Sequence, residues 1–322
     1  MSIPVFAARH VYAAVDPAEA VEAVRSAFVA HARGEWLMPS KVYVPVPPDG
    51  DFRAMPARGG GYAVLKWVTS FPRNPERGLP TVSGIVLLSD ASDGSLLAQL
   101  DAGALTAVRT GAAAVLAAET LAAGEGPAGV IGCGVNGRAV ARTFLARGRR
   151  VFLWDADENR ARKLAASLGV RGQQGLLGRG TALGADVVAT VTPGRELIFE
   201  PGSLRPGQHV SLMGADGPGK AEIAVEELRR ARVVVDEWEQ ASHNGDVSRA
   251  VQSGEVGRAD VTELGRILLG EEPGRTAPDE ITVFDSTGLA VQDLAIAAAV
   301  YERWRRDPGA DAFAGVVSIE LA

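Results

Sequence analysis

Residues 128–155 read AGVIGCGVNGRAVARTFLARGRRVFLWD and carry the strongest structural signal in this sequence. A short apolar run leads into Gly132, Gly134 and Gly137, and a helix-compatible segment follows. A second apolar run then ends in Asp155. Strand, glycine turn, helix, strand and acid in this order are typical of a dinucleotide-binding βαβ unit. A plain glycine-rich loop is the alternative, because the chain has 38 glycines and a lone GxGxxG is weak evidence.

Each glycine of such a turn, and the acid that follows it, has a physical role. Gly132 permits the tight turn, Gly134 lets backbone N–H groups approach a pyrophosphate, and Gly137 lets the helix pack closely against the strand. Asp155 stands where a carboxylate accepts hydrogen bonds from a ribose 2′-OH, and it would repel a 2′-phosphate. We therefore expect NAD(H) rather than NADP(H). The expected cofactor contacts in this segment are Gly132, Gly134, Val135, Asn136, Gly137 and Asp155.

The composition bounds the class of protein. A chain of 322 residues with 47% hydrophobic and 22% charged residues is typical of a globular protein, and its length predicts two domains. A net charge of −6 argues against a nucleic-acid surface. The N-terminal residues do not resemble a signal peptide, and no apolar run suggests a membrane span, so a cytoplasmic enzyme is expected.

Metal chemistry is not expected either. The single cysteine, Cys133, excludes a disulfide within the chain and predicts a small packing residue in the glycine turn. The four histidines share no metal-ligand spacing and are interpreted as surface or structural residues: His10, His31, His209 and His243.

The segment before the glycine turn predicts a strand-rich domain. Asp16 can cap a helix over 18–32, and an alanine-rich helix is expected over 105–121. Strand-like pieces between them are separated by turns rich in proline and glycine, which favours an antiparallel sheet. These strands are expected at Lys41–Val46, Ala63–Val68, Val82–Leu88 and Leu96–Leu100.

From Ala128 onward strands and helices alternate, which predicts a doubly wound α/β domain. Its further strands are expected at Asp186–Val191, His209–Met213, Arg232–Val235 and Ile281–Phe284. Its further helices are expected at Asn159–Leu168, Glu222–Arg230, Asp246–Val251 and Asp260–Leu269. A long amphipathic helix, Leu289–Arg305, is expected to return to the first domain. The expected fold is a Rossmann domain, 114–289, beside a discontinuous α/β domain, 1–113 with 290–322.

Five segments, spread in order over nearly the whole chain, carry a family resemblance. They are LKWVTSFPRNPERGLPT (65–81), LTAVRTGAAA (105–114), VIGCGVNG (130–137), MGADGPGKAEI (213–223) and FDSTGLAVQDLA (284–295). Together they resemble the ornithine cyclodeaminase/μ-crystallin family, which includes alanine dehydrogenases and ketimine reductases. The resemblance implies an N-terminal α/β substrate and dimerisation domain, completed by the C-terminal helix, and a Rossmann NAD-binding domain. It also implies a homodimer formed through the N-terminal sheet.

Two cations stand in apolar surroundings. A lysine between Leu65 and Trp67 is costly to bury unless it binds an anion, and an outward-facing strand lysine is the alternative for Lys66. Arg109 interrupts an apolar helix, and its guanidinium fork fits a carboxylate, with a structural salt bridge as the alternative. The resemblance assigns both residues to the substrate carboxylate, and it gives Lys66 a possible proton-transfer role.

The resemblance implies four further site residues, with Lys41, Arg53 and Met55 expected at the substrate and Asp216 expected as a catalytic residue. Lys41 occupies the place of a carboxylate-binding arginine, keeping the charge but losing the fork. Arg53, two residues before Met55, replaces the glutamate that cyclodeaminases carry, and it would repel the distal amine of ornithine. The alternative is an Arg53 that points to solvent. Asp216 follows an expected Rossmann strand and matches the family's acid/base, although an aspartate in a glycine- and proline-rich turn is common.

The remaining expectations concern the cofactor side. Thr110, Thr192, Ser286 and Gly288 are expected to contact NAD, by position and resemblance. Lys220 is expected to belong to its turn or to pair with a nearby acid. Asp236 and Glu237 are interpreted as solvated or capping groups.

The leading functional hypothesis is NAD(H)-dependent hydride transfer at the α-carbon of an L-amino acid or a linear or cyclic imino acid. Lys41, Lys66 and Arg109 would orient the carboxylate and Asp216 would manage the amine or water proton. One alternative is an ornithine- or lysine-type cyclodeaminase, an ammonia lyase with catalytic NAD. Another is a protein that binds NAD(H) or a small ligand with little turnover.

Overall fold

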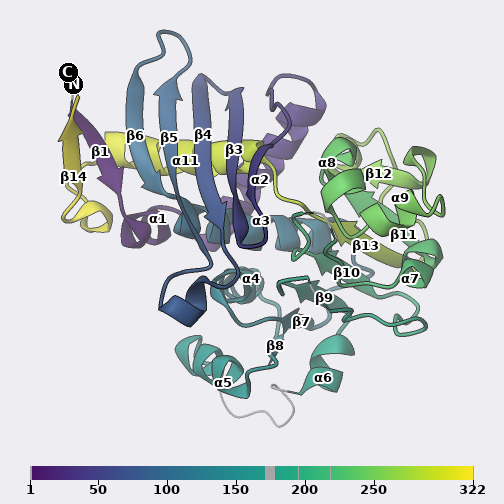
Figure 1. Cartoon of the computed structure of the whole chain (residues 1–322). Coiled ribbons are helices and arrows are strands. Elements are labelled where there is room, and N and C mark those ends of the chain that lie inside the picture. Colours follow the sequence, from purple (N-terminus) through teal and green to yellow (C-terminus); the bar gives the residue numbers. More distant parts are fainter. Residues whose placement is uncertain (1, 171–177, 195, 218, 322) are drawn as a thin grey trace. The chain divides into compact units, whose positions relative to one another are not determined.

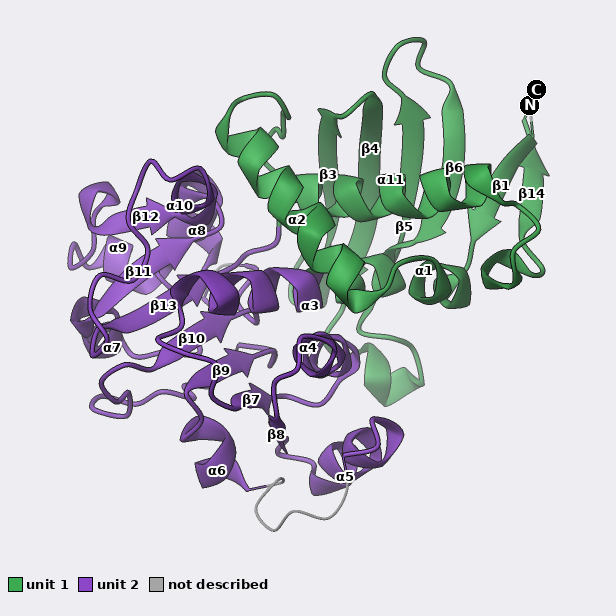
Figure 2. Cartoon of the chain, turned by 180° about the vertical axis from the view of Figure 1, so that it is seen from behind, with its two compact units in different colours: residues 1–109, 289–322 green, residues 110–288 purple. Residues whose placement is uncertain are grey.

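The computed structural model describes residues 2–170, 178–194, 196–217 and 219–321. The chain forms two compact units, residues 1–109 with 289–322 and residues 110–288 (Figure 2). Each unit is built around one seven-stranded sheet (Figure 1). The first unit is discontinuous, because the chain comes back to it at Leu289.

The sheet of the first unit has the order β14-β1-β6-β5-β4-β3-β2. Neighbouring strands from β6 to β2 are antiparallel, as expected, whereas β1 pairs with β6 in parallel. Its strands are β1 (Ser2–Phe6), β2 (Val42–Val46), β3 (Gly50–Gly59), β4 (Tyr62–Ser70), β5 (Val82–Asp90), β6 (Leu96–Asp101) and β14 (Val317–Glu320). The sequence analysis missed β1, β3 and β14. Strand β3 contains Arg53, Pro56 and Arg58, which obscure its apolar alternation.

Helices cover one face of this sheet, as Figure 2 shows for α2 and α11. The helices of this unit are α1 (Ala8–Ala14), α2 (Pro17–Ala32) and α11 (Ala290–Arg306), with 3-10 turns η1 (Asn74–Arg77) and η3 (Asp311–Phe313). The expected cap is confirmed, since the Asp16 carboxylate accepts hydrogen bonds from the N–H groups of Ala18 and Glu19. Along β4, Val64, Lys66 and Val68 are buried while Leu65 and Trp67 are exposed. The side-chain alternation of a strand therefore places Lys66 on the buried face.

The second unit contains a fully parallel sheet of order β12-β11-β13-β10-β9-β7-β8. Its strands are β7 (Ala128–Ile131), β8 (Val151–Trp154), β9 (Val187–Thr190), β10 (His209–Leu212), β11 (Ala231–Val235), β12 (Val261–Glu263) and β13 (Ile281–Asp285). The strand order reverses between β7 and β9, which is the switch point where doubly wound sheets bind ligands. The predicted Rossmann-type α/β fold is confirmed.

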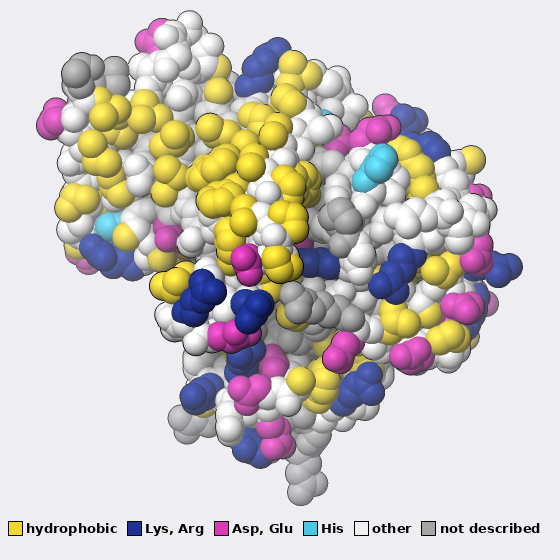
Figure 3. All heavy atoms as spheres, in the orientation of Figure 1, with side chains coloured by type: hydrophobic (Ala, Val, Ile, Leu, Met, Phe, Trp, Pro, Cys, Tyr) yellow, Lys and Arg dark blue, Asp and Glu magenta, His cyan; other side chains and the backbone are white. Residues whose placement is uncertain are grey.

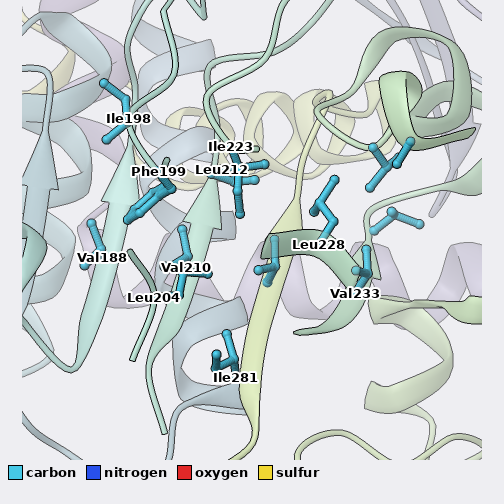
Figure 4. Close-up of a cluster of buried hydrophobic side chains, with 14 of the residues drawn as sticks. Val188, Ile198, Phe199, Leu204, Val210, Leu212, Ile223, Leu228, Val233 and Ile281 are labelled. Carbon is cyan, nitrogen blue, oxygen red and sulfur yellow. The ribbon is translucent and has the colours of Figure 1, made fainter. Parts of the chain in front are cut away.

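The helices of this unit follow the strands as α/β alternation requires. They are α4 (Val135–Ala146), α5 (Glu158–Ser167), α6 (Arg179–Leu183), α7 (Val225–Arg230), α8 (Trp238–Asn244), α9 (Ser248–Gln252) and α10 (Leu264–Leu268), with a 3-10 turn η2 (Arg258–Asp260). This unit contains a core of buried hydrophobic side chains that includes Phe199 and is contributed by the strands, by helices such as α7 and by the loop segment 198–204 (Figure 4). Val188, Val210 and Val233 have at most 3% exposed surface, so the sheet is buried along its centre.

Two expectations for this unit need correction. A helix over 260–269 is wrong in its first half, because Val261 and Thr262 pair with Val233 and Val234 as β12. Two β-branched residues beside a sheet edge fit a strand better than a helix. The helix expected from Glu222 begins only at Val225, and α8 was not predicted.

Helix α3 (Ala102–Leu121) also corrects the expectation that no apolar run could span a membrane. This helix is long and apolar enough to cross a membrane, because it has 20 residues and an 18-residue window with a mean hydropathy of 1.2. However, 78% of this 18-residue window is buried within the structure, and a core helix of a globular protein can have the same length and composition.

Candidate active site

The glycine turn after β7 uses its three glycines for three different reasons. Gly132 adopts a φ of +97°, which a side chain would strain. A Cβ at Gly137 would lie 1.8 Å from the carbonyl oxygen of Gly132, so helix α4 can approach the turn only with glycine there. A Cβ at Gly134 would meet no atom of the described residues within 4 Å. Gly134 is thus not required by the packing of the turn among the described residues, and the space beside it is open.

Asp155 is held at the end of β8 by the same turn. Its Oδ2 accepts a hydrogen bond from the Cys133 N–H at 2.7 Å, and its Oδ1 accepts one from the Asp157 N–H at 2.8 Å. The side chain remains partly exposed. Burial, with the nearby Asp155 charge, raises the pKa of Cys133 to about 12, so this thiol stays neutral. The expected packing role of Cys133 fits that environment.

These features fit a dinucleotide. Helix α4 begins at Val135 directly after an exposed Gly134, so its first backbone N–H groups face outward with the positive end of the helix dipole. Within the same unit, a Cβ at Gly111 of α3 would lie 2.9 Å from the carbonyl oxygen of Ala139 in α4. The predicted cofactor residue Thr110 precedes this close helix contact and is 3% exposed.

A buried glutamate organises the turn after β9. Glu222 has no exposed surface and accepts hydrogen bonds from the hydroxyls of Thr190 at 2.6 Å and of Thr192 at 2.5 Å. Its carboxylate also accepts the backbone N–H of Gly214 at 3.1 Å. Thr192, a predicted cofactor residue, is therefore fixed by Glu222, and the sequence analysis assigned Glu222 no such role.

The predicted residues Ser286 and Gly288 are brought together by an unexpected partner. The Oδ2 of Asp236 accepts hydrogen bonds from the Ser286 hydroxyl at 3.0 Å and from the Gly288 N–H at 2.8 Å. Asp236 is only 3% exposed, so its interpretation as a solvated group is wrong. Neighbouring parallel strands β11 and β13 end side by side, which brings Asp236 to this loop.

Two more carboxylates are buried near this edge without an assigned role. Asp246 and Asp285 are at most 1% exposed, and the Oδ2 of Asp246 and the Oδ1 of Asp285 have no hydrogen-bond partner among the described residues. Burial raises the pKa of Asp285 to about 8 and raises that of Asp246 well above its usual value. Each of these two neighbouring carboxyls therefore retains its proton to a higher pH than an exposed aspartate does.

Asp216 lies in the turn after β10, as predicted. Its Oδ1 receives a hydrogen bond from the Lys220 Nζ at 2.5 Å, so the expected pairing of Lys220 with an acid is confirmed. Both side chains are about one-third exposed, at 38% and 27%. Asp216 is therefore a solvent-accessible carboxylate beside a cation.

The first unit collects two of the predicted cations around one buried acid. The Lys66 Nζ lies 2.7 Å from the Oδ2 of Asp293, and the Arg109 Nε lies 3.4 Å from its Oδ1. Lys66 is 2% exposed, Arg109 8% and Asp293 0%. The alternative of an outward-facing Lys66 is therefore wrong. Strand β4, helix α3 and helix α11 each supply one of the three side chains.

Burial changes the ionisation of Lys66. Desolvation lowers its pKa to about 8, the Asp293 carboxylate opposes that shift, and the charges of Arg109 and Arg53 add to it. A lysine with such a pKa can give up a proton near neutral pH. The same ammonium donates to the Thr106 hydroxyl at 3.3 Å.

Arg53 lies on the buried face of β3. Its Nε and Nη2 donate to the two carboxylate oxygens of Asp51 at 2.5 and 3.1 Å, and its guanidinium lies 5.3 Å from the centre of the Tyr43 ring. With 7% exposure it does not point to solvent, so that alternative is wrong. Met55, two residues on, is 4% exposed. Lys41 is half-buried just before β2.

The sequence analysis missed the partners rather than the cations. Asp293 was visible as a lone acid in the apolar run AVQDLAIAAAV of α11, and a buried acid requires a cation. Asp51 and Glu222 gave no such signal, because each stands in a polar or glycine-rich segment. Among the described residues, no group of three or more His, Cys, Asp or Glu side chains could hold a metal ion.

The structure thus defines a class: a Rossmann-type protein with a glycine turn suited to a dinucleotide, whose other unit buries a lysine–arginine pair suited to a carboxylate. The chain belongs to the ornithine cyclodeaminase/mu-crystallin family, whose model matches residues 5–307. The predicted family membership is confirmed.

Individual relatives support this assignment. The chain is 43% identical over 293 residues to an alanine dehydrogenase of Archaeoglobus fulgidus, covering 88% of this chain and 89% of the relative. It is 33% identical over 255 residues to an ornithine cyclodeaminase of Agrobacterium tumefaciens, covering 76% of this chain and 70% of the relative. An archaeal alanine dehydrogenase dimer solved with bound NAD superposes with a TM-score of 0.91 over the whole of both chains, at 37% identity.

Proposed function

We propose that this protein is an NAD(H)-dependent oxidoreductase that acts at the α-carbon of an L-amino acid or of the corresponding linear or cyclic imine. The observation that carries this proposal is the buried Lys66–Arg109 pair, because two cations sharing one acid suit a further carboxylate. Membership of a family that contains amino-acid dehydrogenases supports the reaction class. The unit 1–109 with 289–322 is the proposed substrate domain and the unit 110–288 the proposed cofactor domain.

In the proposed reaction the chain's own residues bind the acid and move a proton. Lys66 and Arg109 bind the substrate carboxylate, with Lys41 and Arg53 adding positive charge and Met55 an apolar contact. Asp216, held by Lys220, takes or returns the proton of the substrate amine or of water. Lys66 has a pKa of about 8, so it can serve in proton transfer as well.

The cofactor in this proposal is NAD rather than NADP. Backbone N–H groups at Gly134, Val135 and Asn136 hold the pyrophosphate at the start of α4, and Asp155 holds the ribose. Gly132 and Gly137 shape the turn, while Thr110, Thr192, Ser286 and Gly288 complete the proposed contacts. When bound, NAD supplies the acceptor or donor of a hydride.

A cyclodeaminase is the second candidate, favoured by the similarity to an ornithine cyclodeaminase. That reaction needs a carboxylate for a distal ammonium. Arg53 with its partner Asp51 places a guanidinium on the same buried face as Lys66, which disfavours a distal ammonium there. A binding protein with little turnover is the third candidate, and the combination of Lys66, Arg109 and Asp216 argues against it.

A second copy of this chain is the proposed partner. The face of the first unit's sheet opposite α2 and α11 exposes large apolar side chains, which gather in Figure 3 over these strands. Trp67 is 40% exposed and stacks on Phe52 at 5.6 Å, and Val42 is 56% exposed. The alanine dehydrogenase of similar structure is a dimer. We propose a homodimer through this face, and we place it in the cytoplasm.

A paired assay tests the proposed function. Purified protein with NAD⁺ is supplied with L-alanine, L-ornithine, L-lysine and other L-amino acids, while NADH and ammonia are both followed. NADH rising together with ammonia supports the dehydrogenase. Ammonia released from ornithine or lysine without net NADH supports the cyclodeaminase, and silence with these amino acids and with NADH plus imines supports the binding protein.

A further inference from the structure

The acid that joins Lys66 to Arg109 stands in the first turn of α11. Asp293 has no exposed surface, and it reaches Lys66 on β4 at 2.7 Å and Arg109 on α3 at 3.4 Å. A buried carboxylate of this kind is costly unless it is paired, and pairing with two cations from two elements fixes both of them. The family motif FDSTGLAVQDLA contains this residue.

Simple anchoring of α11 to the sheet would be the alternative role, and the hydrogen bonding argues against it. The three charges sum to one net positive charge, since two cations face one anion. The buried Nε2 of the neighbouring Gln292 has no hydrogen-bond partner among the described residues, and the Arg109 Nε and both Asp293 oxygens make only ion pairs without hydrogen-bond geometry. The Oε1 of Gln292 accepts from the Arg109 Nη1 at 3.4 Å. A purely structural cluster satisfies its buried donors, whereas here the net positive charge and the Gln292 amide donor are left unmatched.

The geometry points to Asp293 as a positioning residue for substrate binding. It fixes the Lys66 ammonium and the Arg109 guanidinium beside each other, so that their remaining N–H donors and their surplus charge meet one substrate carboxylate. This inference rests on the proposed function, because it assumes that a carboxylic acid binds at Lys66 and Arg109.

Asp293 also keeps Lys66 charged. The charged groups that act on Lys66 are Asp293 on α11, Arg109 on α3 and Arg53 on β3, and of these only Asp293 favours the ammonium. Removing its charge therefore lowers the pKa of Lys66 below about 8. Carboxylate binding should then fail at a lower pH than in the wild type. A loss of α11 packing alone, with the charge beside Lys66 kept, would not produce that shift in carboxylate binding.

The test compares Asp293→Asn with Asp293→Glu in the full-length protein saturated with NADH. The probe is the amino acid that turns over fastest in the paired assay, or L-alanine if none turns over. Its Kd is measured by calorimetry over a pH series, with the NADH affinity and the melting temperature measured beside it. Glu302→Gln is the matched control, because it removes a carboxylate from the same helix at a residue bonded to Tyr62 and Arg305.

We expect Asp293→Asn to weaken probe binding by roughly tenfold or more and to move the alkaline loss of binding to lower pH. Asp293→Glu should weaken binding through its extra methylene yet keep the alkaline loss near the wild-type pH, so it carries the test if Asp293→Asn does not fold. NADH affinity should be unchanged in both variants. The inference is overturned if Asp293→Asn binds the probe like the wild type, or if both variants lose affinity and melting temperature together with no shift in the pH series. A wild-type protein that binds NADH but no acid of the panel overturns the proposed function instead.

Discussion

Among single residues, Arg109 is the one that we propose to bind the substrate carboxylate through its guanidinium. Replacing it by glutamine leaves Asp293 with Lys66 alone and removes the guanidinium fork. We expect Arg109→Gln to raise the KM for the amino acid by roughly tenfold or more while the Kd for NADH stays within twofold. Steady-state kinetics and fluorescence titration measure the two quantities, and Arg303→Gln, an exposed change on α11, is the control. An equal loss of both affinities would contradict the role.

The single residue Asp155 is expected to set the preference for NADH over NADPH. Its carboxylate is bonded to the N–H groups of Cys133 and Asp157, so asparagine can keep one of these bonds while losing the charge. We expect Asp155→Asn to reduce the preference for NADH over NADPH. The variant should bind NADH more weakly, and it should bind NADPH better because the negative charge that repels the 2′-phosphate is gone. Titrations with both cofactors check this, and an unchanged ratio of the two Kd values would argue that Asp155 has a structural role only.

The glycine turn is the element whose parts can be separated experimentally. A Cβ at Gly137 would lie 1.8 Å from a carbonyl oxygen, whereas one at Gly134 would meet no described atom within 4 Å. Gly137→Ala should therefore lower the free energy of unfolding by about 1–3 kcal/mol and weaken NADH binding as well. Gly134→Ala should keep the melting temperature but weaken NADH binding. If Gly134→Ala binds NADH like the wild type, the pyrophosphate does not lie over this glycine.

The buried Asp285 at the end of β13 should make the free energy of unfolding depend on pH. Burial raises the pKa of Asp285 to about 8 from 3.8, so the folded state binds a proton that the unfolded state releases. Stability from this group is complete below the unfolded pKa and is lost as the pH rises through about 8. We expect Asp285→Asn to flatten the fall in unfolding free energy between about pH 5 and about pH 8. Urea denaturation at several pH values measures it.

Comparing the wild type with Asp285→Asn also removes the contribution of His209, which changes stability with pH in the opposite direction. Burial lowers the pKa of His209 to about 3, which makes stability rise with pH below its ordinary value of 6.5. That contribution is the same in the wild type and in Asp285→Asn. Identical pH dependence of the two proteins would show that Asp285 is ionised throughout.

Among the helices and strands, the sequence best predicts those whose buried residues form a local apolar pattern. Strands β7 and β9 are buried on both faces and consist mainly of apolar residues, so the Rossmann fold of this unit could be predicted from the sequence. Strand β3 was missed because it buries a charged residue, Arg53, on the face where an apolar one is expected. Edge strand β12 has only three residues, too few for a pattern.

The buried cations of the candidate site were predictable from the sequence, whereas their buried acid partner was not. Lys66 and Arg109 each interrupt an apolar stretch, which a sequence displays directly. Their common partner Asp293 lies 184 residues beyond Arg109, and Asp246 and Asp285 approach each other through folding of the second unit. Such pairings depend on tertiary structure, so no local spacing reveals them.

For the whole molecule, assembly follows from the exposed apolar sheet face of the first unit. We expect a mass of twice the 33.5 kDa monomer by size-exclusion chromatography with light scattering. Trp67→Glu should shift the mass toward that of the monomer, because it places a charge in the centre of this face. Glu22→Gln, an exposed change on α2, is the control. A wild-type protein that elutes as a monomer would contradict the assembly.

Isotope transfer from the α-carbon tests the central claim most directly. The protein is incubated with NAD⁺ and L-alanine deuterated at the α-carbon, and with other panel amino acids labelled in the same way, and the cofactor is then analysed by mass spectrometry. Our account predicts that the reduced cofactor carries the deuterium of the preferred amino acid and that ammonia appears in equal amount. Reduced cofactor without deuterium, or no reduction with any labelled amino acid and no NADH oxidation with imines, would contradict it.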